Sequence, residues 1–457
     1  MRRAQPFVAA LLLVGVLAAA TYADRELGPR TYDQGTDGAA SSGAWLCPHG
    51  GGPEGWEISL QIANPGPGPA TVRVRSLGSG RPSEQQDIRV DPGSFVRVPV
   101  AADGRARSSM VEWFGQWVAV GWVAHAGGGE AGVASEPCAP SSADRWFLPD
   151  GTTEVEGNEE FVVVMNPFAR EAVFSLTLLS ERNEPVQQGE LTDVVVKPFR
   201  SVAFHLNDVV LGERTVSTLL EVSVGRVAAA TLGVAGTGGI RSALGYLGQP
   251  PPVLTFPGGA DAGRTELIVM NGGSAGETGR VELSGEILGT EGVQPFAGLA
   301  EASLPPGSAR TFPATTAGAS AVRISVTGDD AAAVRRTYGV VSDQAAITGA
   351  EPAAAWVVLP AVAGLPAVPG LVLSNPSSEP VVVTLSYLEP GPAEGIEVTV
   401  PPGATIQAPK EFRLLAPEVA VLAEASEGTF VPAAVSYSLG REGLAAFAAA
   451  IGVPVPR

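Results

Sequence analysis

The sequence predicts an all-β protein: a tandem array of four immunoglobulin-like β-sandwich domains after an N-terminal signal or anchor segment. Three observations favour this fold: landmarks that recur about every hundred residues, alternation of apolar and polar residues between them, and turn residues at about every 8–12 positions. A period of this length indicates whole domains, because solenoid units span roughly 20–50 residues and propeller blades span about half of the observed period.

Two landmarks mark the start of each unit. The first is a short aromatic or apolar run that ends in proline, at residues 45–48 (WLCP), 146–149 (WFLP), 254–257 (LTFP) and 356–360 (WVVLP). The second is an asparagine-centred turn, at Asn64, Asn166, Asn271 and Asn375. The same landmarks in the same order four times indicate a repeated unit rather than chance matches.

The interior of each unit is predicted to form β-strands. In the first unit Val72 and Val74 flank Arg73, and such alternation is typical of a half-buried strand. In the third unit Val281 and Leu283 lie two positions further from their asparagine, which keeps the same face inward. Each unit then closes with a hairpin whose glycine supplies the positive φ of a tight turn. These glycines are Gly115, Gly225, Gly328 and Gly428.

The landmarks set the predicted domain boundaries. They are 1–23 for a signal peptide or membrane anchor, 24–43 for a flexible linker, 44–140 for the first sandwich, 144–249 for the second, 252–350 for the third and 354–457 for the fourth. The linkers between the sandwiches are short, and the one at 250–252 is three prolines, so we expect stiff junctions and an elongated particle.

Composition narrows the classes of partner. The chain has a formal charge of −18, and Lys197 and Lys410 are its only lysines. An acidic chain without a basic stripe is a poor ligand for phosphate backbones, so nucleic-acid binding is not expected.

The N-terminal segment is predicted to direct export. Arg2 and Arg3 precede an apolar run over 6–20, which suits either a cleaved secretory signal or a marginal membrane-spanning helix. Both alternatives place the rest of the chain outside the membrane, because the positive charges stay inside.

Two cysteines bracket the first unit. Cys47 and Cys138 are the only ones in the chain, and an even count in an exported protein favours a disulfide over two buried thiols. Such a bridge would close a loop of about ninety residues and contribute roughly 4 kcal/mol in the chain-entropy model. Two distant cysteines without paired histidines do not make a zinc site.

One string has a catalytic form. Residues 272–276 (GGSAG) match the nucleophile elbow, but a strand rather than a helix is predicted after them, and His49, His125 and His205 all lie upstream. No metal-hydrolase or phosphate-binding motif is present in the sequence, so we expect no enzyme activity and no cofactor.

An acidic cluster follows the second tryptophan landmark. Its members are Asp150, Glu154, Glu156, Glu159 and Glu160. Clustered carboxylates at a domain junction could bind calcium, but the spacing fits no calcium-binding loop, and an exposed acidic turn is the preferred interpretation.

The first unit differs from the others in its tryptophans. It holds five of the seven: Trp45, Trp56, Trp113, Trp117 and Trp122. Exposed tryptophans stack on sugars or anchor protein interfaces, which makes Trp113 and Trp117 the candidate binding residues. The competing interpretation is that all five lie in the core of a disulfide-bonded domain.

The leader, the Trp-x-Cys-Pro motif at 45–48, the Asn-Pro turns and the lysine-poor composition together resemble a family of actinobacterial exported proteins of unknown function. Members of that family are often encoded near sugar-nucleotide and glycosyltransferase genes. The resemblance implies a cell-envelope context, assigns no activity and supplies no functional residues.

These observations favour a non-enzymatic, extracytoplasmic scaffold or adaptor of the cell envelope, either membrane-anchored or secreted. The expected partner is an envelope protein or a cell-surface glycan, with membrane contact through the N-terminal segment only. The alternative is an array of glycan-binding modules, and a third hypothesis is an enzyme with an unfamiliar site.

Overall fold

A computed structural model describes residues 42–456, apart from 81–84, 155–156, 183, 237–238, 259–263, 274–278, 301, 317, 329, 340–342, 363–367, 390–394, 410–418 and 439–445. The described residues form β-strands and four 3₁₀ helices of three residues each, so the all-β prediction is confirmed. None of their helices is long and apolar enough to cross a membrane. The predicted signal or anchor at 1–23 lies outside the described residues, and so does the linker at 24–43 except for Ser42 and Gly43, which begin the first strand.

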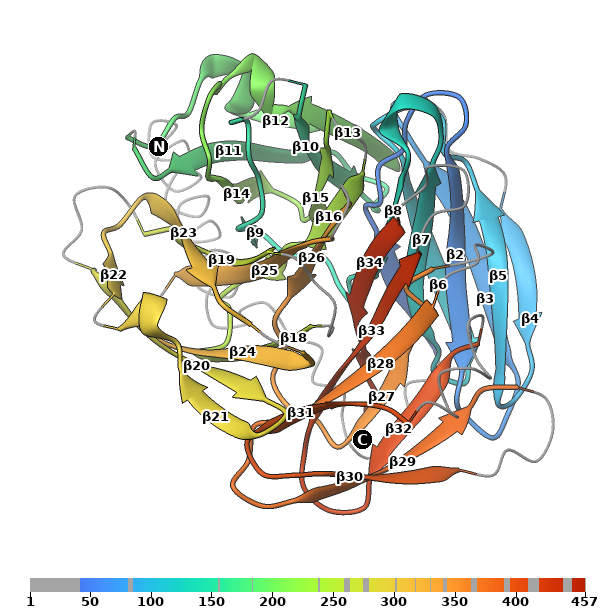
Figure 1. Ribbon diagram of the computed structural model, residues 1–457. Helices are drawn as coiled ribbons and strands as arrows, with labels where there is room; N and C mark the ends of the chain where they lie inside the picture. Colours follow the sequence, from blue (N-terminus) through green and yellow to red (C-terminus); the bar gives the residue numbers. More distant parts are fainter. Residues whose placement is uncertain are drawn as a thin grey trace, which may run out of the picture. The chain divides into compact units, whose positions relative to one another are not determined.

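The strands fall into four consecutive segments, 1 to 4, at residues 42–139, 143–247, 253–350 and 353–454 (Figure 1). Segment 1 contains β1 (Ser42–Cys47), β2 (Glu57–Asn64), β3 (Ala70–Leu77), β4 (Gln86–Val90), β5 (Ser94–Val100), β6 (Ser108–Gly115), β7 (Ala119–Ala126), η1 (Gly128–Glu130) and β8 (Gly132–Pro137). Segment 2 contains β9 (Arg145–Leu148), β10 (Glu159–Asn166), β11 (Ala172–Ser180), η2 (Gly189–Leu191), β12 (Val194–Val196), β13 (Arg200–His205), η3 (Leu206–Asp208), β14 (Val216–Val224), β15 (Ala228–Val234), β16 (Ile240–Leu244) and β17 (Tyr246–Leu247).

Segment 3 contains β18 (Val253–Gly258), β19 (Arg264–Asn271), β20 (Val281–Gly289), β21 (Gly292–Pro295), η4 (Ala297–Leu299), β22 (Ala302–Leu304), β23 (Ser308–Ala314), β24 (Ser320–Thr327), β25 (Ala331–Tyr338) and β26 (Gln344–Thr348). Segment 4 contains β27 (Ala355–Val358), β28 (Val368–Asn375), β29 (Val381–Tyr387), β30 (Ile396–Val400), β31 (Ala404–Gln407), β32 (Val421–Ala425), β33 (Val431–Ser438), β34 (Ala446–Ile451) and β35 (Val453–Pro454).

Each segment contributes two antiparallel sheets with a common strand order. In segment 1 the orders are β1-β6-β3-β4 and β5-β2-β7-β8, and the corresponding orders recur in the other three segments. Val72 and Val111 of the first sheet share one core with Leu60 and Val120 of the second, so the two sheets pack as in a β-sandwich.

The asparagine landmark ends the second strand of each segment and is buried. The Nδ2 of Asn64 donates to the carbonyl oxygens of Gly68 (2.8 Å) and Val90 (3.1 Å), and its Oδ1 accepts from the amide of Gly66 (3.0 Å). Corresponding bonds form at Asn166, Asn271 and Asn375. The asparagine therefore supplies partners to turn groups that would otherwise be buried without them.

The third segment has a longer asparagine turn than the sequence suggested. The Nδ2 of Asn271 donates to the carbonyl oxygen of Gly279, eight positions later in the chain. The corresponding bond of Asn64 is to Gly68, only four positions later. Val281 pairs with Leu304, as Ala70 pairs with Val90 in segment 1. The strand is therefore shifted by four residues and not by two, and an even shift still keeps the same face inward.

The tryptophan landmark is also held by one recurring bond. The indole Nε1 of Trp45 donates to the carbonyl oxygen of Val118. In the same way Trp146 donates to Val227, and Trp356 donates to Phe430. In segment 3 this position is Leu254, which packs in the core without such a bond. The four predicted hairpin glycines all have positive φ, between 79° and 121°.

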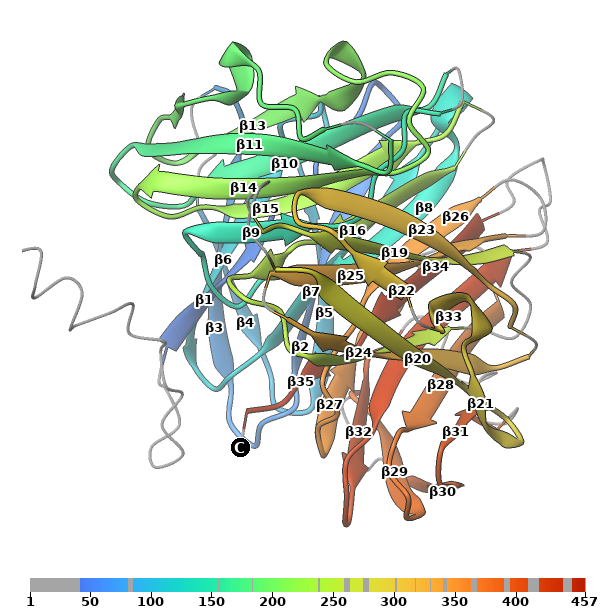
Figure 2. The same cartoon turned by 90° about the vertical axis from the view of Figure 1, so that its left-hand side faces the viewer.

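The last long strands of the four segments lie next to one another. Strand β8 contacts β16 and β34, and β26 contacts the same two strands, so the contacts form a closed series (Figures 1 and 2). One hydrophobic cluster joins Val120 of segment 1, Leu232 of segment 2 and Val357 of segment 4, and another joins Phe147 of segment 2 to Phe256 of segment 3. A third includes buried side chains of segments 1, 3 and 4.

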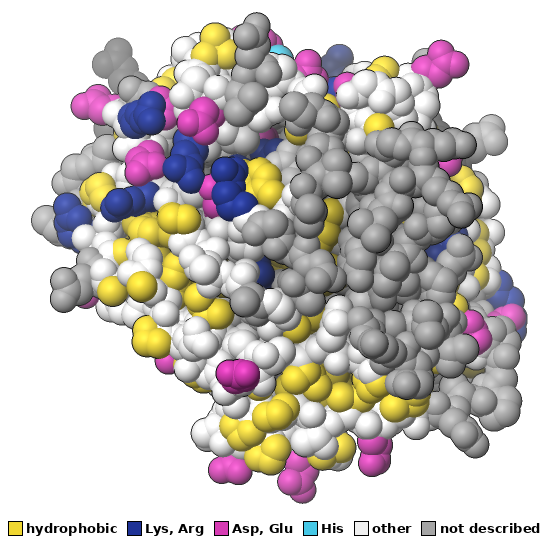
Figure 3. All heavy atoms as spheres, viewed as in Figure 1, with side chains coloured by type: hydrophobic (Ala, Val, Ile, Leu, Met, Phe, Trp, Pro, Cys, Tyr) yellow, Lys and Arg dark blue, Asp and Glu magenta, His cyan; other side chains and the backbone are white. Residues whose placement is uncertain are grey.

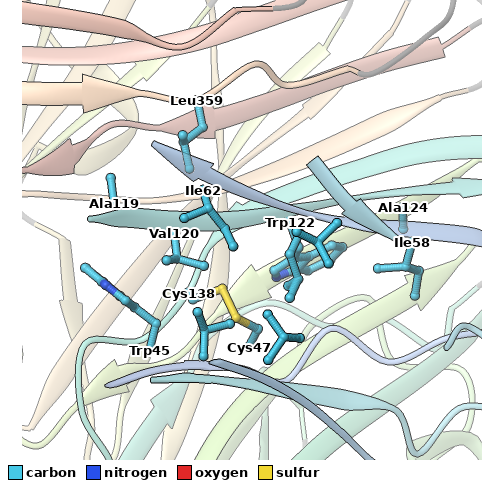
Figure 4. Close-up of a cluster of buried hydrophobic side chains, with 14 of the residues drawn as sticks. Trp45, Cys47, Ile58, Ile62, Ala119, Val120, Trp122, Ala124, Cys138 and Leu359 are labelled. Atoms are coloured by element: carbon cyan, nitrogen blue, oxygen red, sulfur yellow. A yellow bond between two sulfur atoms is a disulfide. The ribbon is translucent and has the colours of Figure 1, made fainter. Parts of the chain in front are cut away.

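Segments 1 and 4 meet although they are distant in the chain. Leu359, after β27, points toward the strands of segment 1 that carry Ile62 and Ala119 (Figure 4). A Cβ on Gly121 would lie 2.7 Å from Cδ1 of Leu359, which explains the glycine. Residues 41–455 form one compact unit with shared cores, so the expectation that stiff linkers keep the sandwiches apart is wrong within this unit.

Candidate functional site

The two tryptophans proposed for binding lie in different surroundings. Trp113 is 5% exposed, and its ring packs so close to Gly43 that a Cβ there would lie 2.7 Å away. Trp117 is partly buried and meets Trp45 edge-on, with ring centroids 6.1 Å apart. They do not form a shared exposed surface, and their role in binding stays a prediction.

The predicted disulfide is present. Cys47 and Cys138 are bonded, with their Cα atoms 4.6 Å apart, in the core of segment 1 beside Val120 and Trp122 (Figure 4). In segments 2 and 3 the residues corresponding to Cys138 are Gly245 and Gly349, whose missing Cβ leaves room for Leu148 and Phe256. A disulfide is typical of an oxidising, extracytoplasmic compartment.

The residues considered for catalysis are described only in part. Residues 274–276 of the GGSAG string lie outside the described residues, and the element that follows is strand β20, not a helix. His49 is fully buried, where burial lowers its pKa to about 4, and its ring bonds to Gly50 and Ser109. Among the described residues no three His, Cys, Asp or Glu side chains are placed to hold a metal ion.

Two members of the acidic cluster are buried, not exposed, so the prediction of an exposed acidic turn is wrong for Asp150 and Glu160. Asp150 accepts from Arg241 Nε on Oδ2 (2.7 Å) and from Arg336 Nε (2.9 Å) and Nη2 (2.6 Å) on Oδ1. Glu160 accepts from Nη2 of Arg241 and from the amide of Thr152. Arg336 comes from segment 3, so this buried network joins two segments.

The network sets the charge state of its carboxyl groups. Burial acts to raise the pKa of Asp150, but the two guanidinium groups outweigh it and hold the pKa below its usual range. Burial raises the pKa of Glu160 to about 7. It also raises the pKa of Glu136, on β8 of segment 1, well above its usual range, and the negative charge of Asp150 adds to the effect.

One further member of the acidic cluster, Glu159, borders an open groove. The groove has a volume of about 1280 Å³ and is lined by the loop before β2 and the start of β2 (52–59), by residues between Pro99 and Arg105, and by Glu130 and Glu159. Of the acidic cluster, only Glu159 lines it, and it is the one lining residue from segment 2.

An arginine organises the wall of this groove. Arg105 donates from Nη2 to Glu130 Oε1 (2.6 Å) and to Glu159 Oε2 (3.2 Å), and from Nη1 to Glu130 Oε2 (3.1 Å). Its guanidinium also lies over the rings of Trp56 (5.3 Å) and Phe161 (4.9 Å). These contacts fix both the arginine and the two carboxylates.

The glycines of the groove make room for its aromatic residue. A Cβ on Gly52 would lie 2.2 Å from the indole of Trp56, whose Nε1 donates to Glu130 Oε2 at 2.8 Å. Gly55 and Gly104 have φ of 96° and 91°, a region that favours glycine.

The model of a family of unknown function, DUF5719, matches residues 110–364. The chain belongs to this family. No curated protein matches the sequence. Among solved structures, the crystal structure of Thermotoga maritima 1070 is 23% identical over 23% of this chain and 96% of its own, with a TM-score of 0.21. Escherichia coli alpha-2-macroglobulin activated by porcine elastase is 13% identical over 91% of this chain and 44% of its own, with a TM-score of 0.11. At these TM-scores neither structure bears on fold or function.

The DUF5719 match covers the two features unequally. The buried network lies within the matched residues, since Asp150, Glu160, Arg241 and Arg336 all fall between 110 and 364. The groove is only partly covered by the match. Glu130 and Glu159 lie within residues 110–364, whereas Trp56 and Arg105 precede residue 110.

Sequence reasoning missed the arginines of this DUF5719 chain. Arg241 lies 91 positions from Asp150 within segment 2, and Arg336, which follows Arg335, lies 186 positions from it in segment 3, so only the folded sheets bring them to Asp150. One signal was available for Arg241: Gly233 lies opposite it in the sheet, and a Cβ there would lie 2.4 Å from its guanidinium carbon. On the face seen in Figure 3, basic side chains gather in one area with acidic side chains beside them.

Proposed function

We propose that this DUF5719 protein is a non-enzymatic scaffold or adaptor of the cell envelope, outside the cytoplasmic membrane. In this proposal its four segments are four immunoglobulin-like sandwiches that act as one rigid body, and residues 1–23 deliver the chain to that compartment as a signal or anchor. The resemblance to exported actinobacterial proteins supports the envelope context.

The observation that carries the proposal is the continuity of the apolar core between segments. Val120, Leu232 and Val357 belong to three different segments and to one cluster. Because shared cores resist relative motion of the segments, the surface keeps a fixed geometry, which suits a protein that positions partners. The disulfide between Cys47 and Cys138 supports the oxidising compartment.

Chemical evidence for catalysis is weak in comparison. Two of the buried carboxyl groups with shifted pKa values, Asp150 and Glu160, are held by Arg241 and Arg336, and all four side chains are at most 1% exposed. A substrate could not reach them without opening the fold. Their arrangement therefore favours a structural role.

Photo-cross-linking in living cells tests the proposal. A photoreactive amino acid replaces Glu54 in the groove or, in a second strain, the exposed Val195 on β12, and adducts are identified by mass spectrometry. We expect one envelope protein to be captured reproducibly from at least one position. Glycan adducts alone, or no protein adduct from either position, would contradict the scaffold proposal.

A further inference from the structure

We infer that the groove between 52–59 and Arg105 binds an extended, arginine- or lysine-bearing segment of a partner protein. This inference rests on the proposed scaffold function and names the chemistry of its partner. It is argued from the size of the groove, its charge and the way it already holds one guanidinium group.

The groove suits a chain rather than a small molecule. Its volume of about 1280 Å³ exceeds the roughly 300–1,000 Å³ of typical small-molecule pockets, which enclose most of their ligand. One side is formed by Pro99 and Val100 at the end of β5, the edge strand of its sheet. Because Pro99 cannot donate a ladder hydrogen bond at this edge, recognition by side chains is favoured over strand addition.

The charge of the groove selects a cation. Its lining carries five carboxylates and one guanidinium, a formal charge of −4. Arg105 compensates Glu130 and Glu159, and Asp103 pairs with Arg107 at 2.6 Å. Glu54 and Glu57 remain, both exposed, in the loop before β2 and at its first residue.

The structure contains an example of the binding mode. Arg105 lies over the faces of Trp56 and Phe161 and shares two carboxylates, Glu130 and Glu159. Aromatic faces and bidentate carboxylates are the groups that recognise guanidinium. A basic side chain of the partner would find Glu54 and Glu57 beside the same wall, and the −18 charge of the chain would speed its approach.

Peptide binding tests the inference. The probe is a fluorescent eight-residue peptide of alternating arginine and serine, measured by anisotropy at low salt. The groove variant is E54Q/E57Q, and the matched control is E171Q/E291Q, which removes the same charge from two exposed glutamates outside the groove. We expect the groove variant to bind at least about tenfold more weakly and the control to stay within about twofold of the unchanged protein.

The other outcomes would overturn the inference. These are equal weakening in both variants, no binding by the unchanged protein, or binding of a neutral oligosaccharide in place of the peptide. Circular dichroism of both variants excludes misfolding as the cause of a loss. If the E54Q/E57Q variant with the photoreactive amino acid at Val195 still cross-links to the envelope partner, the groove inference fails and the scaffold proposal stands. If the unchanged protein captures no protein at all, the proposed function fails whatever the peptide does.

Discussion

At the scale of single residues, the side chains that recur in this fold are those that satisfy buried backbone groups. Asn375 donates to the carbonyl oxygens of Glu379 (2.7 Å) and Val400 (3.1 Å) and accepts from the amide of Ser377 (3.0 Å). An apolar residue of similar size would fit the space but leave these groups without partners. That need explains why asparagine stands at the same turn in each segment.

Asn375→Ala should lower the free energy of unfolding by about 1–3 kcal/mol, the usual cost of leaving buried polar groups unpaired. Urea unfolding followed by tryptophan fluorescence measures the change. Glu397→Ala is the control, because Glu397 is exposed on β30 and takes no part in the bonds of Asn375. Equal losses in the two variants would show that the asparagine bonds are not the source of the stability.

Glu136→Gln should stabilise the protein at alkaline pH and change little at pH 4. Burial, with the nearby charge of Asp150, raises the pKa of Glu136 well above 4.5, so the folded state keeps a proton that the unfolded state has released. Stability from this group is therefore lost as pH rises above about 4.5, and glutamine removes that loss. We expect a gain of about 1–2 kcal/mol at pH 8, where the unfolded state has lost this proton and burial still opposes its loss from the folded state.

Urea unfolding of both proteins at pH 4 and pH 8 measures this difference. Burial also raises the pKa of Glu160 to about 7 and of Asp343 to about 8, so stability falls with rising pH in both proteins. Only the difference between the two proteins reports on Glu136. A difference between the two proteins that does not grow with pH would contradict the assignment to Glu136.

At the scale of strands, the buried network is the feature that ties elements of different segments. Asp150 follows β9, while Arg241 lies on β16 and Arg336 on β25. Removing one partner leaves the other groups charged and buried, which is strongly destabilising. Replacing the whole network by apolar residues of similar volume need not be. The network therefore makes the relative placement of β16 and β25 specific.

Arg336→Met should destabilise the protein by about 3–5 kcal/mol, because it leaves Asp150 with one guanidinium in place of two. Arg264→Met is the control: Arg264 lies on β19 with 62% of its side chain exposed and a 3.5 Å contact to Glu266, and exposed pairs contribute less than about 1 kcal/mol. Thermal unfolding at pH 7 distinguishes them. Similar shifts in melting temperature would argue against the network.

The strands of one segment were predictable from the sequence, and the contacts between segments were not. Alternation at Val72 and Val74 reports which face of a strand is buried, and the glycine turns report where strands end. The bond from Arg336 to Asp150 joins residues 186 positions apart, and no local pattern contains it. For the same reason the groove wall of Arg105 and Glu159, from two segments, was not predicted.

At the scale of the whole molecule, four segments with common core clusters are expected to lose their structure together. We expect differential scanning calorimetry to show one unfolding transition for the described unit, with calorimetric and van't Hoff enthalpies in agreement. Scans at two heating rates control for irreversibility. Two or more separated transitions would show that the segments are independent domains, in spite of the shared clusters.

The shared core of segments 1 and 4 has a consequence for how the chain is made. Val120 and Trp122 pack in the same cluster as Val357 and Val453, which emerge from the ribosome more than two hundred residues later. The first sandwich must therefore wait with an uncovered apolar flank while the rest is synthesised, a period in which nascent chains are prone to aggregate. The bond between Cys47 and Cys138 lies within segment 1 and needs no residue of the later segments, so once the chain reaches an oxidising compartment this segment can be cross-linked before its neighbours pack on it.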